Sequence, residues 1–382
     1  MASVEKTTRV CGKTNKPVAA YRARWRDDTG RQRCKTFAKK GDADRFVATM
    51  VAALARGSYI DPGAGRLKVA EYAERWRVIQ DHRAGTAALY ERALRLHVYA
   101  RLGDRPLASV RHSDAQAFVT ALSRSLAPNT ARQVHAITRT VFRAAVHDRL
   151  ISESPFASIK LPAVRRARID LLTADQLRAV IDAAPPRLRA LVILAAATGL
   201  RSGEMLGLTA NRVDFLRREV RVDRQLVYVP GSPPTFGPPK TPDSARSVPL
   251  PAFAAEALAA HLAAYPAGED GLIFQSDKGG PVLRTTLHGR WRATLRRAGV
   301  DSGVHLHHLR HWYASTLNAN GVPFTTVQEV LGHAPQGVTW ATYTHKTEGW
   351  DRAVRNVLET VWRQDVYRPC TDGQAQAADL RR

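Results

Sequence analysis

Cysteine, acidic side chains and long apolar runs are all scarce in this chain of 382 residues. The cysteines lie far apart and form no CxxC pair: Cys11, Cys34 and Cys370. This spacing argues against a disulfide framework or a cysteine zinc site and fits a reducing compartment. The longest strongly apolar run, residues 190–197, is far shorter than the roughly 18 residues that span a bilayer. Because the N-terminus also lacks the apolar core of a secretory signal, we expect a cytoplasmic protein with no membrane partner.

The shortage of acidic residues leaves a large positive charge. Lysine and arginine number 58 against 34 aspartates and glutamates, so the formal net charge is +24. Hydrophobic residues at 44% and charged residues at 24% are ordinary values for a folded protein. The length suggests about two to four domains. A folded chain with this surplus of positive charge needs a polyanionic partner, and nucleic acid is the leading candidate.

The first segment, residues 1–65, carries 14 basic against 6 acidic residues. Its pattern predicts a strand over residues 21–26, a turn at 27–30, a second strand from residue 31 and then a helix. One face of this small sheet is predicted to carry six basic residues for DNA binding: Arg22, Arg24, Arg26, Arg31, Arg33 and Lys35. A sheet of this size fits a DNA major groove. The alternative is a solvated hairpin on an already basic protein.

The second segment, residues 66–163, has apolar residues at helical spacing almost throughout and predicts a bundle of helices. Pro128 is placed to open its last helix. A basic linker containing proline leads into a third segment, residues 164–363, which contains both helical and strand-like patterns. Residues 348–363 predict an amphipathic C-terminal helix. Residues 364–382 predict a disordered tail.

The third segment contains the residues that are suited to chemistry. Arg201 follows a buried helix, and Glu204 lies three residues later, either to orient an arginine or as a plain helix residue. Lys240 is the only lysine between residues 160 and 278. An amine can give up a proton, whereas a guanidinium cannot. Several further polar residues cluster towards the end of the segment: His305, His307, His308, Arg310, His311, His333, Tyr343 and His345.

Two alternative assignments concern this cluster. His307 and His311 have the i, i+4 spacing of a zinc site on a helix. No glutamate lies between them and no third ligand is evident, so we expect no metal. Tyr313 is the rival to Tyr343 as a reactive tyrosine, and we interpret it as a core residue beside Trp312.

Four motifs in order resemble the signature boxes of the tyrosine recombinases, the phage integrase family. They are TGLRSGE around Arg201, HxLRH from His307 to His311, LGH ending at His333, and YTH beginning at Tyr343. The resemblance covers about residues 20–360. It implies a multidomain fold, mainly α with small β-sheets. The implied domains are an N-terminal arm-type DNA-binding domain of small sheet plus helix, a helical core-binding bundle and a mixed α+β catalytic domain.

The resemblance also implies a mechanism. Arg201 and Arg310 would bind the nonbridging oxygens of the scissile phosphate, because a guanidinium fork donates to two oxygens at once. Tyr343 would attack phosphorus, with His307 as its base or proton shuttle. His333 would donate a hydrogen bond to the phosphate, and Lys240 would protonate the departing 5′ oxygen. The sequence contains no GxxxxGK phosphate loop and no carboxylates with metal-ligand spacing, so neither a metal nor another cofactor is expected.

The implied function is site-specific recombination through a 3′-phosphotyrosyl intermediate and a Holliday junction, integrating or excising a mobile element. The implied partners are double-stranded DNA with core and arm-type sites, a homotetramer, an excisionase and a host DNA-bending protein, in the nucleoid of a bacterial cell. The C-terminal helix would dock on a neighbouring subunit; the alternative is packing on its own. Two other functions stay open: a type IB topoisomerase-like relaxation of DNA, and a non-catalytic DNA-binding regulator.

Overall fold

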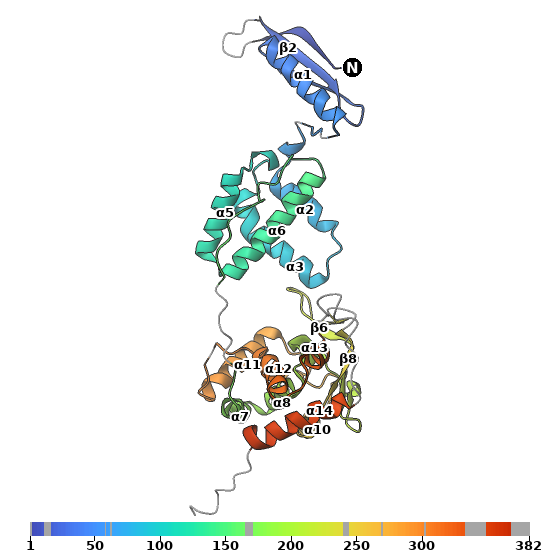
Figure 1. Ribbon diagram of the computed structural model, residues 1–382, viewed down its shortest axis with the longest axis vertical. Helices are drawn as coiled ribbons and strands as arrows, with labels where there is room; N and C mark the ends of the chain where they lie inside the picture. The colour runs from blue at the N-terminus through green and yellow to red at the C-terminus, as the bar shows by residue number, and fades with distance from the viewer. Residues whose placement is uncertain are drawn as a thin grey trace, which may run out of the picture. The chain divides into compact units, whose positions relative to one another are not determined.

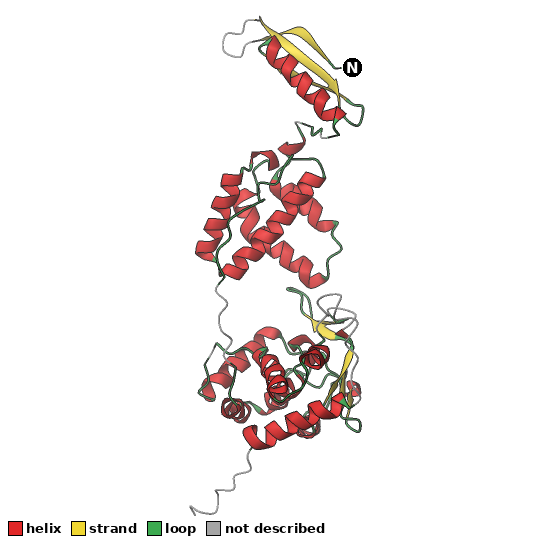
Figure 2. Cartoon of the chain, viewed as in Figure 1, coloured by secondary structure: helices red, strands yellow, loops and turns green. Residues whose placement is uncertain are grey.

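The computed structural model describes residues 2–10, 17–57, 59–61, 63–164, 171–239, 244–268, 270–301, 303–332 and 349–367. The chain divides into two compact units, residues 1–166 and 167–382 (Figure 1). Helices dominate both units, and the strands form small antiparallel sheets (Figure 2). The prediction of a mainly α fold with small β-sheets is therefore confirmed. None of the described helices combines the length and apolar character that a membrane span requires.

The chain begins with a three-stranded antiparallel sheet in the order β1 (Ser3–Val10), β2 (Pro17–Arg26), β3 (Gln32–Phe37). The helix α1 (Lys40–Ala55) packs against this sheet (Figure 1). Trp25 and Phe37 on the sheet both contact Phe46 of α1, with ring centroids 5.2 Å apart in each pair. Strands β2 and β3, the turn between them and the helix were predicted, whereas β1 was missed.

The register of this sheet corrects the prediction of one shared basic face. Arg24 lies opposite Cys34, and Trp25 lies opposite Arg33. Directly opposite residues in an antiparallel pair share a face, and successive residues alternate between faces. Arg33 and Lys35 therefore lie on the side of Trp25, which α1 covers. Of the six basic residues predicted for one face, the three on β2 lie on the open face: Arg22, Arg24 and Arg26.

The rest of the first unit is the predicted helical bundle. Its main helices are α2 (Val69–Val78), α3 (Ala84–Ala93), the π-helical η2 (Leu94–Tyr99), α4 (Ala100–Leu102), α5 (His112–Ser125) and α6 (Pro128–His147). Short 3₁₀ turns lie at η1 (Ala64–Arg66) and η3 (Leu107–Ser109). Pro128 occupies the first turn of α6, where its missing N–H costs no hydrogen bond. The buried side chains of the bundle form one apolar cluster of their own.

The second unit surrounds α8 (Pro186–Thr198), which is buried throughout residues 190–198 and packs against α10 (Ala252–Ala264) and α12 (His308–Ala319). The other helical elements in the described part of this unit are α7 (Ala174–Ala183), α9 (Ser202–Leu206), η4 (Ala210–Arg212), α11 (Arg284–Arg297), α13 (Phe324–Leu331), α14 (Trp350–Val361) and the π-helical η6 (Trp362–Val366). One sheet has the order β4 (Val213–Asp214), β5 (Glu219–Val222), β8 (Arg246–Pro249), and a hairpin pairs β6 (Gln225–Val227) with β7 (Thr235–Gly237).

The C-terminal helix packs on its own unit. Val354 and Leu358 of α14 are buried in the core of the unit. Trp362 stacks on Phe253 of α10 with ring centroids 3.9 Å apart. The single chain thus shows α14 packed on its own unit, and docking of the helix on a neighbouring subunit stays a prediction. The predicted start of the disordered tail at residue 364 is too early, because residues 364–366 complete η6 and Val366 is fully buried.

Candidate active site

Arg201 lies at the junction of two helices, as the sequence predicted. Gly199 ends α8 in the left-handed region, with φ of 60°, and Arg201 is the N-cap residue of α9. Its backbone N–H and its Nη1 each donate to a different oxygen of Glu204, both at 2.9 Å. The side chain of Arg201 is 27% exposed. The guanidinium is thus held in one orientation while part of it stays open to solvent.

Arg310 lies in the first turns of α12 and is only 4% exposed. Its Nη1 donates to the carbonyl of Gly199 and its Nη2 to the carbonyl of Leu331, both at 2.7 Å. Burial, and then the neighbouring charge of Arg201, lowers the pKa of Arg310 to about 10. The group therefore stays protonated at neutral pH and supplies a fixed positive charge next to Arg201.

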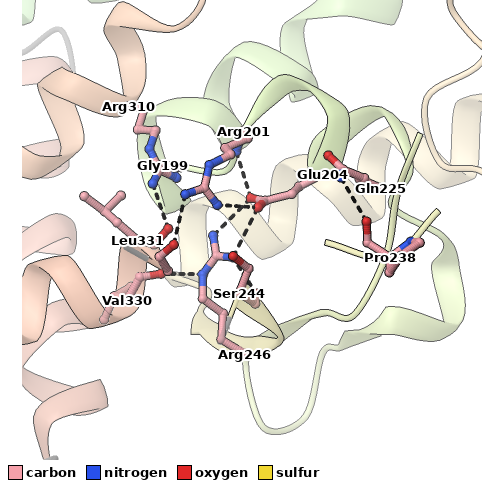
Figure 3. A network of polar contacts seen from close by, with 11 residues as sticks. Gly199, Arg201, Glu204, Gln225, Pro238, Ser244, Arg246, Arg310, Val330 and Leu331 are labelled. Atoms are coloured by element: carbon pink, nitrogen blue, oxygen red, sulfur yellow. Dashed lines mark hydrogen bonds and ion pairs between the residues drawn. The ribbon is translucent and has the colours of Figure 1, made fainter. Parts of the chain in front are cut away.

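Three arginines converge on the last turn of α13 (Figure 3). Each donates to a different backbone carbonyl: Arg246 to Val330 at 2.6 Å, Arg310 to Leu331 at 2.7 Å and Arg201 to Gly332 at 2.9 Å. The last carbonyls of a helix have no partner within the helix and carry partial negative charge. The guanidinium groups satisfy these carbonyls, so the end of α13 fixes three cations in one place.

Glu204 joins two of these arginines. Its carboxylate accepts hydrogen bonds from Arg201 and from Arg246, the latter at 3.0 Å and 3.3 Å (Figure 3). Burial alone would raise the pKa of Glu204, but the hydrogen bond and charge of Arg246, followed by Arg201, lower it below its ordinary value. Glu204 is therefore an ion-pair partner that orients an arginine, which was one of the two alternatives, and not a plain helix residue.

His307 is the N-cap residue of α12, three residues before Arg310. The protein around its ring disfavours the charged form, and the nearby His311 and Arg310 add to this, so its pKa is lowered. The ring of His311 lies 5.1 Å away between centroids. At neutral pH the His307 imidazole is therefore neutral and able to accept a proton.

Tyr313 lies in the core of the unit and is fully buried. Its hydroxyl has no hydrogen-bond partner within the described part of the chain. Burial raises the pKa of this phenol above its ordinary value. A protonated, enclosed hydroxyl cannot act as a nucleophile towards DNA, which supports the interpretation of Tyr313 as a core residue.

The structure thus brings together three of the six predicted catalytic residues: Arg201, His307 and Arg310. The others lie outside the described residues: Lys240, His333 and Tyr343. Arg246 was missed by the sequence reasoning. The available signal was its alternation with Val248 in a strand-like stretch, which places both side chains on the inward face. Over the described ranges, no group of three or more His, Cys, Asp or Glu side chains is arranged to hold a metal.

The predicted DNA-binding residues of the N-terminal sheet have different environments. On the open face, Arg24 forms an ion pair with Glu5 of β1 at 2.9 Å. On the covered side, Arg33 is paired with two carboxylates, Asp27 at 2.9 Å and Asp61 at 2.7 Å. The remaining four are Lys35, whose ammonium lies 4.7 Å from the ring centroid of Phe46, the exposed Arg31 that precedes β3, the exposed Arg26 at the end of β2, and the half-buried Arg22.

Comparison with known proteins agrees with this geometry. Residues 170–349 match the phage integrase family, and residues 69–162 match the phage integrase central domain. The chain is 30% identical over 243 residues to a XerC-like tyrosine recombinase of Caldanaerobacter subterraneus, covering 56% of this chain and 62% of that protein. It is 26% identical over 335 residues to the phiRv2 prophage integrase of Mycobacterium tuberculosis, covering 85% of this chain and 88% of that one.

Solved structures share the fold. The integrase of transposon Tn1549, in complex with transposon right end DNA, superposes with a TM-score of 0.64 at 22% identity, over 77% of this chain and all of that one. A lambda integrase tetramer bound to a Holliday junction gives a TM-score of 0.56 at 17% identity, covering 85% of this chain and 92% of that one. The chain belongs to the phage integrase family and is a site-specific tyrosine recombinase that acts on DNA.

Proposed function

We propose that this recombinase cleaves DNA by attack of Tyr343 on a phosphodiester and forms a 3′-phosphotyrosyl intermediate. Strand exchange then proceeds through a Holliday junction and integrates or excises a mobile element. The observation that carries the proposal is the convergence of Arg201 and Arg310 on the last turn of α13, which leads directly into His333. The four motifs of the family lie in the same unit as this convergence.

The chemistry follows from the charges. Attack at phosphorus concentrates negative charge on the nonbridging oxygens, and fixed donors aimed at that charge lower the barrier. Arg310 supplies a buried cation whose pKa, although lowered to about 10, stays above neutral pH. A neutral His307 accepts the phenolic proton of Tyr343, whose reference pKa is near 10. Lys240 protonates the departing 5′ oxygen.

The reaction conserves the energy of the broken bond in the protein–DNA link, so we propose that it requires neither a metal nor ATP. We also propose a homotetramer on two duplexes, with an excisionase and a host DNA-bending protein as accessory partners, on the nucleoid in the cytoplasm. The lambda integrase tetramer on a Holliday junction, which shares the fold, supports this assembly. EDTA should leave the rate of cleavage unchanged if the proposal is right.

A nicked suicide duplex tests the nucleophile. Wild-type protein should accumulate a covalent protein–DNA complex on it, whereas Tyr343→Phe should bind the same DNA within a few fold and form none. The matched control is Tyr313→Phe, which removes a buried hydroxyl and should still form the complex. A complex that persists in Tyr343→Phe and disappears in Tyr313→Phe would reassign the nucleophile.

For the N-terminal sheet we propose binding to arm-type DNA sites through its open face. This face carries Arg22, Arg24 and Arg26, whereas Arg33 is already neutralised by Asp27 and Asp61. Binding at one of two linked sites raises the effective concentration of the protein at the other site. The full chain should therefore bind a DNA that carries both arm and core sites more tightly than a core site alone.

Salt dependence tests this face. Replacing Arg22 and Arg26 by glutamine should lower the slope of log binding constant against log salt by about 0.9 per lost phosphate contact. Arg45→Gln is the control, because Arg45 lies on α1, on the opposite side of the sheet. Equal effects in both variants would mean that the basic residues act only through net charge.

A further inference from the structure

Arg246 is a buried cation that none of the assigned roles uses. It begins β8, and its side chain is 5% exposed. Both sides of its planar group are engaged. Nε donates to the carbonyl of Val330 at 2.6 Å, Nη1 to the carbonyl of Ser244 at 3.0 Å, and Nη2 to Glu204 at 3.0 Å (Figure 3). A buried charge is tolerated only when it is paired and hydrogen-bonded in this way.

The partners of Arg246 are shared with the catalytic arginines. Glu204 also accepts from the guanidinium and the backbone N–H of Arg201. The carbonyl of Val330 immediately precedes the two carbonyls that hold Arg310 and Arg201. Arg246 therefore fixes both sides of the Arg201 guanidinium, through the carboxylate on one side and through the end of α13 on the other.

The packing encloses the Arg246 side chain more than that of Arg201. A Cβ built on Gly332, which ends α13 with φ of 66°, would lie 3.0 Å from Nη1 of Arg246. The helix end is thus in direct contact with the guanidinium. Four of the five N–H donors of Arg246 have partners in the described part of the chain, and its side chain is 5% exposed, against 27% for Arg201. The groups through which Arg246 can act on the reaction are therefore its neighbours, Glu204 and the end of α13.

We propose that Arg246 is a positioning residue for strand cleavage. It holds the Glu204 carboxylate, and through it the guanidinium of Arg201, in the orientation that receives the scissile phosphate. Its hydrogen bond to Val330 holds the last turn of α13 in a fixed position relative to Glu204 and Arg201. This role rests on the proposed function of Arg201.

The test is single-turnover formation of the covalent complex at saturating DNA, on a suicide duplex that contains the crossover sequence. Arg246→Gln should slow cleavage by about 10-fold or more, the scale on which neighbouring groups couple. The dissociation constant for DNA should change by less than about 3-fold, because the enclosed side chain of Arg246 donates to protein partners. Arg246→Lys keeps the charge without the planar fork, so its cleavage rate should lie between those of the wild type and Arg246→Gln. Arg221→Gln is the control, because it removes the same charge from the neighbouring strand β5 at a side chain that is 72% exposed.

A double-mutant cycle separates positioning from general destabilisation. If Arg246 acts through Arg201, replacing Arg246 should slow cleavage much less when Arg201 is already alanine. The loss of cleavage rate should fall from about 10-fold in the wild-type background to about 2-fold in the Arg201→Ala background. The same factor in both backgrounds would overturn the proposal. If Arg246→Gln does not fold, Arg246→Lys decides the question. Cleavage by folded Arg246→Lys at the wild-type rate, or failure of both variants to fold, would reject the positioning role.

The behaviour of the wild-type protein distinguishes failure of the proposed function from failure of the positioning role. Wild-type protein that forms no covalent complex overturns the proposed function, and the role of Arg246 with it. Wild-type protein that cleaves, alongside Arg246 variants that cleave equally well, overturns the positioning role alone.

Discussion

Gly199 offers a sharp test of how closely the site is packed, because two independent constraints act on it. Its φ of 60° lies in the left-handed region, where a side chain costs roughly 1–2 kcal/mol. A Cβ at this position would lie 2.7 Å from Cδ1 of Tyr313 and 2.9 Å from Cδ2 of Leu331. The Tyr313 ring is fully buried and cannot swing away, so we add an overpacking cost of about 1–3 kcal/mol. Gly199→Ala should therefore destabilise the second unit by about 2–5 kcal/mol.

The control for this prediction is Gly321→Ala in the same unit. Gly321 has φ of 81° but nothing within 4 Å of an added Cβ, so its replacement measures the backbone cost alone, about 1–2 kcal/mol. Hydrogen exchange of the α8 amides is the assay, since core amides exchange through the largest opening of their unit. Equal losses of protection in the two variants would refute the packing argument.

The same substitution should also affect cleavage. The carbonyl of Gly199 accepts a hydrogen bond from Nη1 of Arg310 at 2.7 Å. A shift of the backbone at Gly199 moves the acceptor that orients this cation. We expect folded Gly199→Ala protein, measured well below its unfolding temperature, to form the covalent complex more slowly than Gly321→Ala. Equal rates would mean that Arg310 is held without this carbonyl.

Three further predictions follow from the charges of the molecule. Arg201→Ala or Arg310→Ala should slow covalent-complex formation by a factor of about 100, the scale of one lost charge-stabilising donor, and a loss below about 5-fold would contradict the assignment. Lys240→Ala should be rescued by a substrate whose 5′ leaving oxygen is sulfur, because a thiolate leaves without a proton; rescue of Arg201→Ala instead would move the acid role. The hydrogen bond from Thr29, opposed by burial and assisted by Arg33, lowers the pKa of Asp27 from 3.8 to about 2. The stability that this carboxylate adds is complete above about pH 4 and is lost as the pH falls towards 2. The melting temperature of the N-terminal sheet should therefore depend less on pH between about 4 and 2 in Asp27→Asn than in the wild type.

The elements that the sequence predicted well are those with local causes. Thr173 and Gln176 form the reciprocal capping box that starts α7. Pro128 starts α6, and the left-handed Gly199 ends α8 immediately before Arg201. Each of these signals depends on a few neighbouring residues, so the sequence contains all the information that they need.

Register and partner choice could not be predicted in the same way. Arg22 and Lys35 both alternate with apolar residues, but only strand pairing decides whether the two strands present their basic residues on the same face. The partner of Glu204 posed the same difficulty, because Arg246 lies 42 residues further along the chain. Periodicity indicates that a side chain points inward and does not say which buried group it meets.

The charges of the described site fit the transition state better than the substrate. Arg201, Arg246 and Arg310 carry three positive charges, and Glu204 returns one negative charge, which leaves a surplus of two. The end of α13 offsets this by roughly half a charge through its backbone dipoles. A phosphodiester in DNA brings a single negative charge, whereas the pentacoordinate phosphorus formed by attack of an oxyanion has two. Since only interactions that strengthen in the transition state accelerate the step, a buried surplus of this size favours cleavage over simple binding.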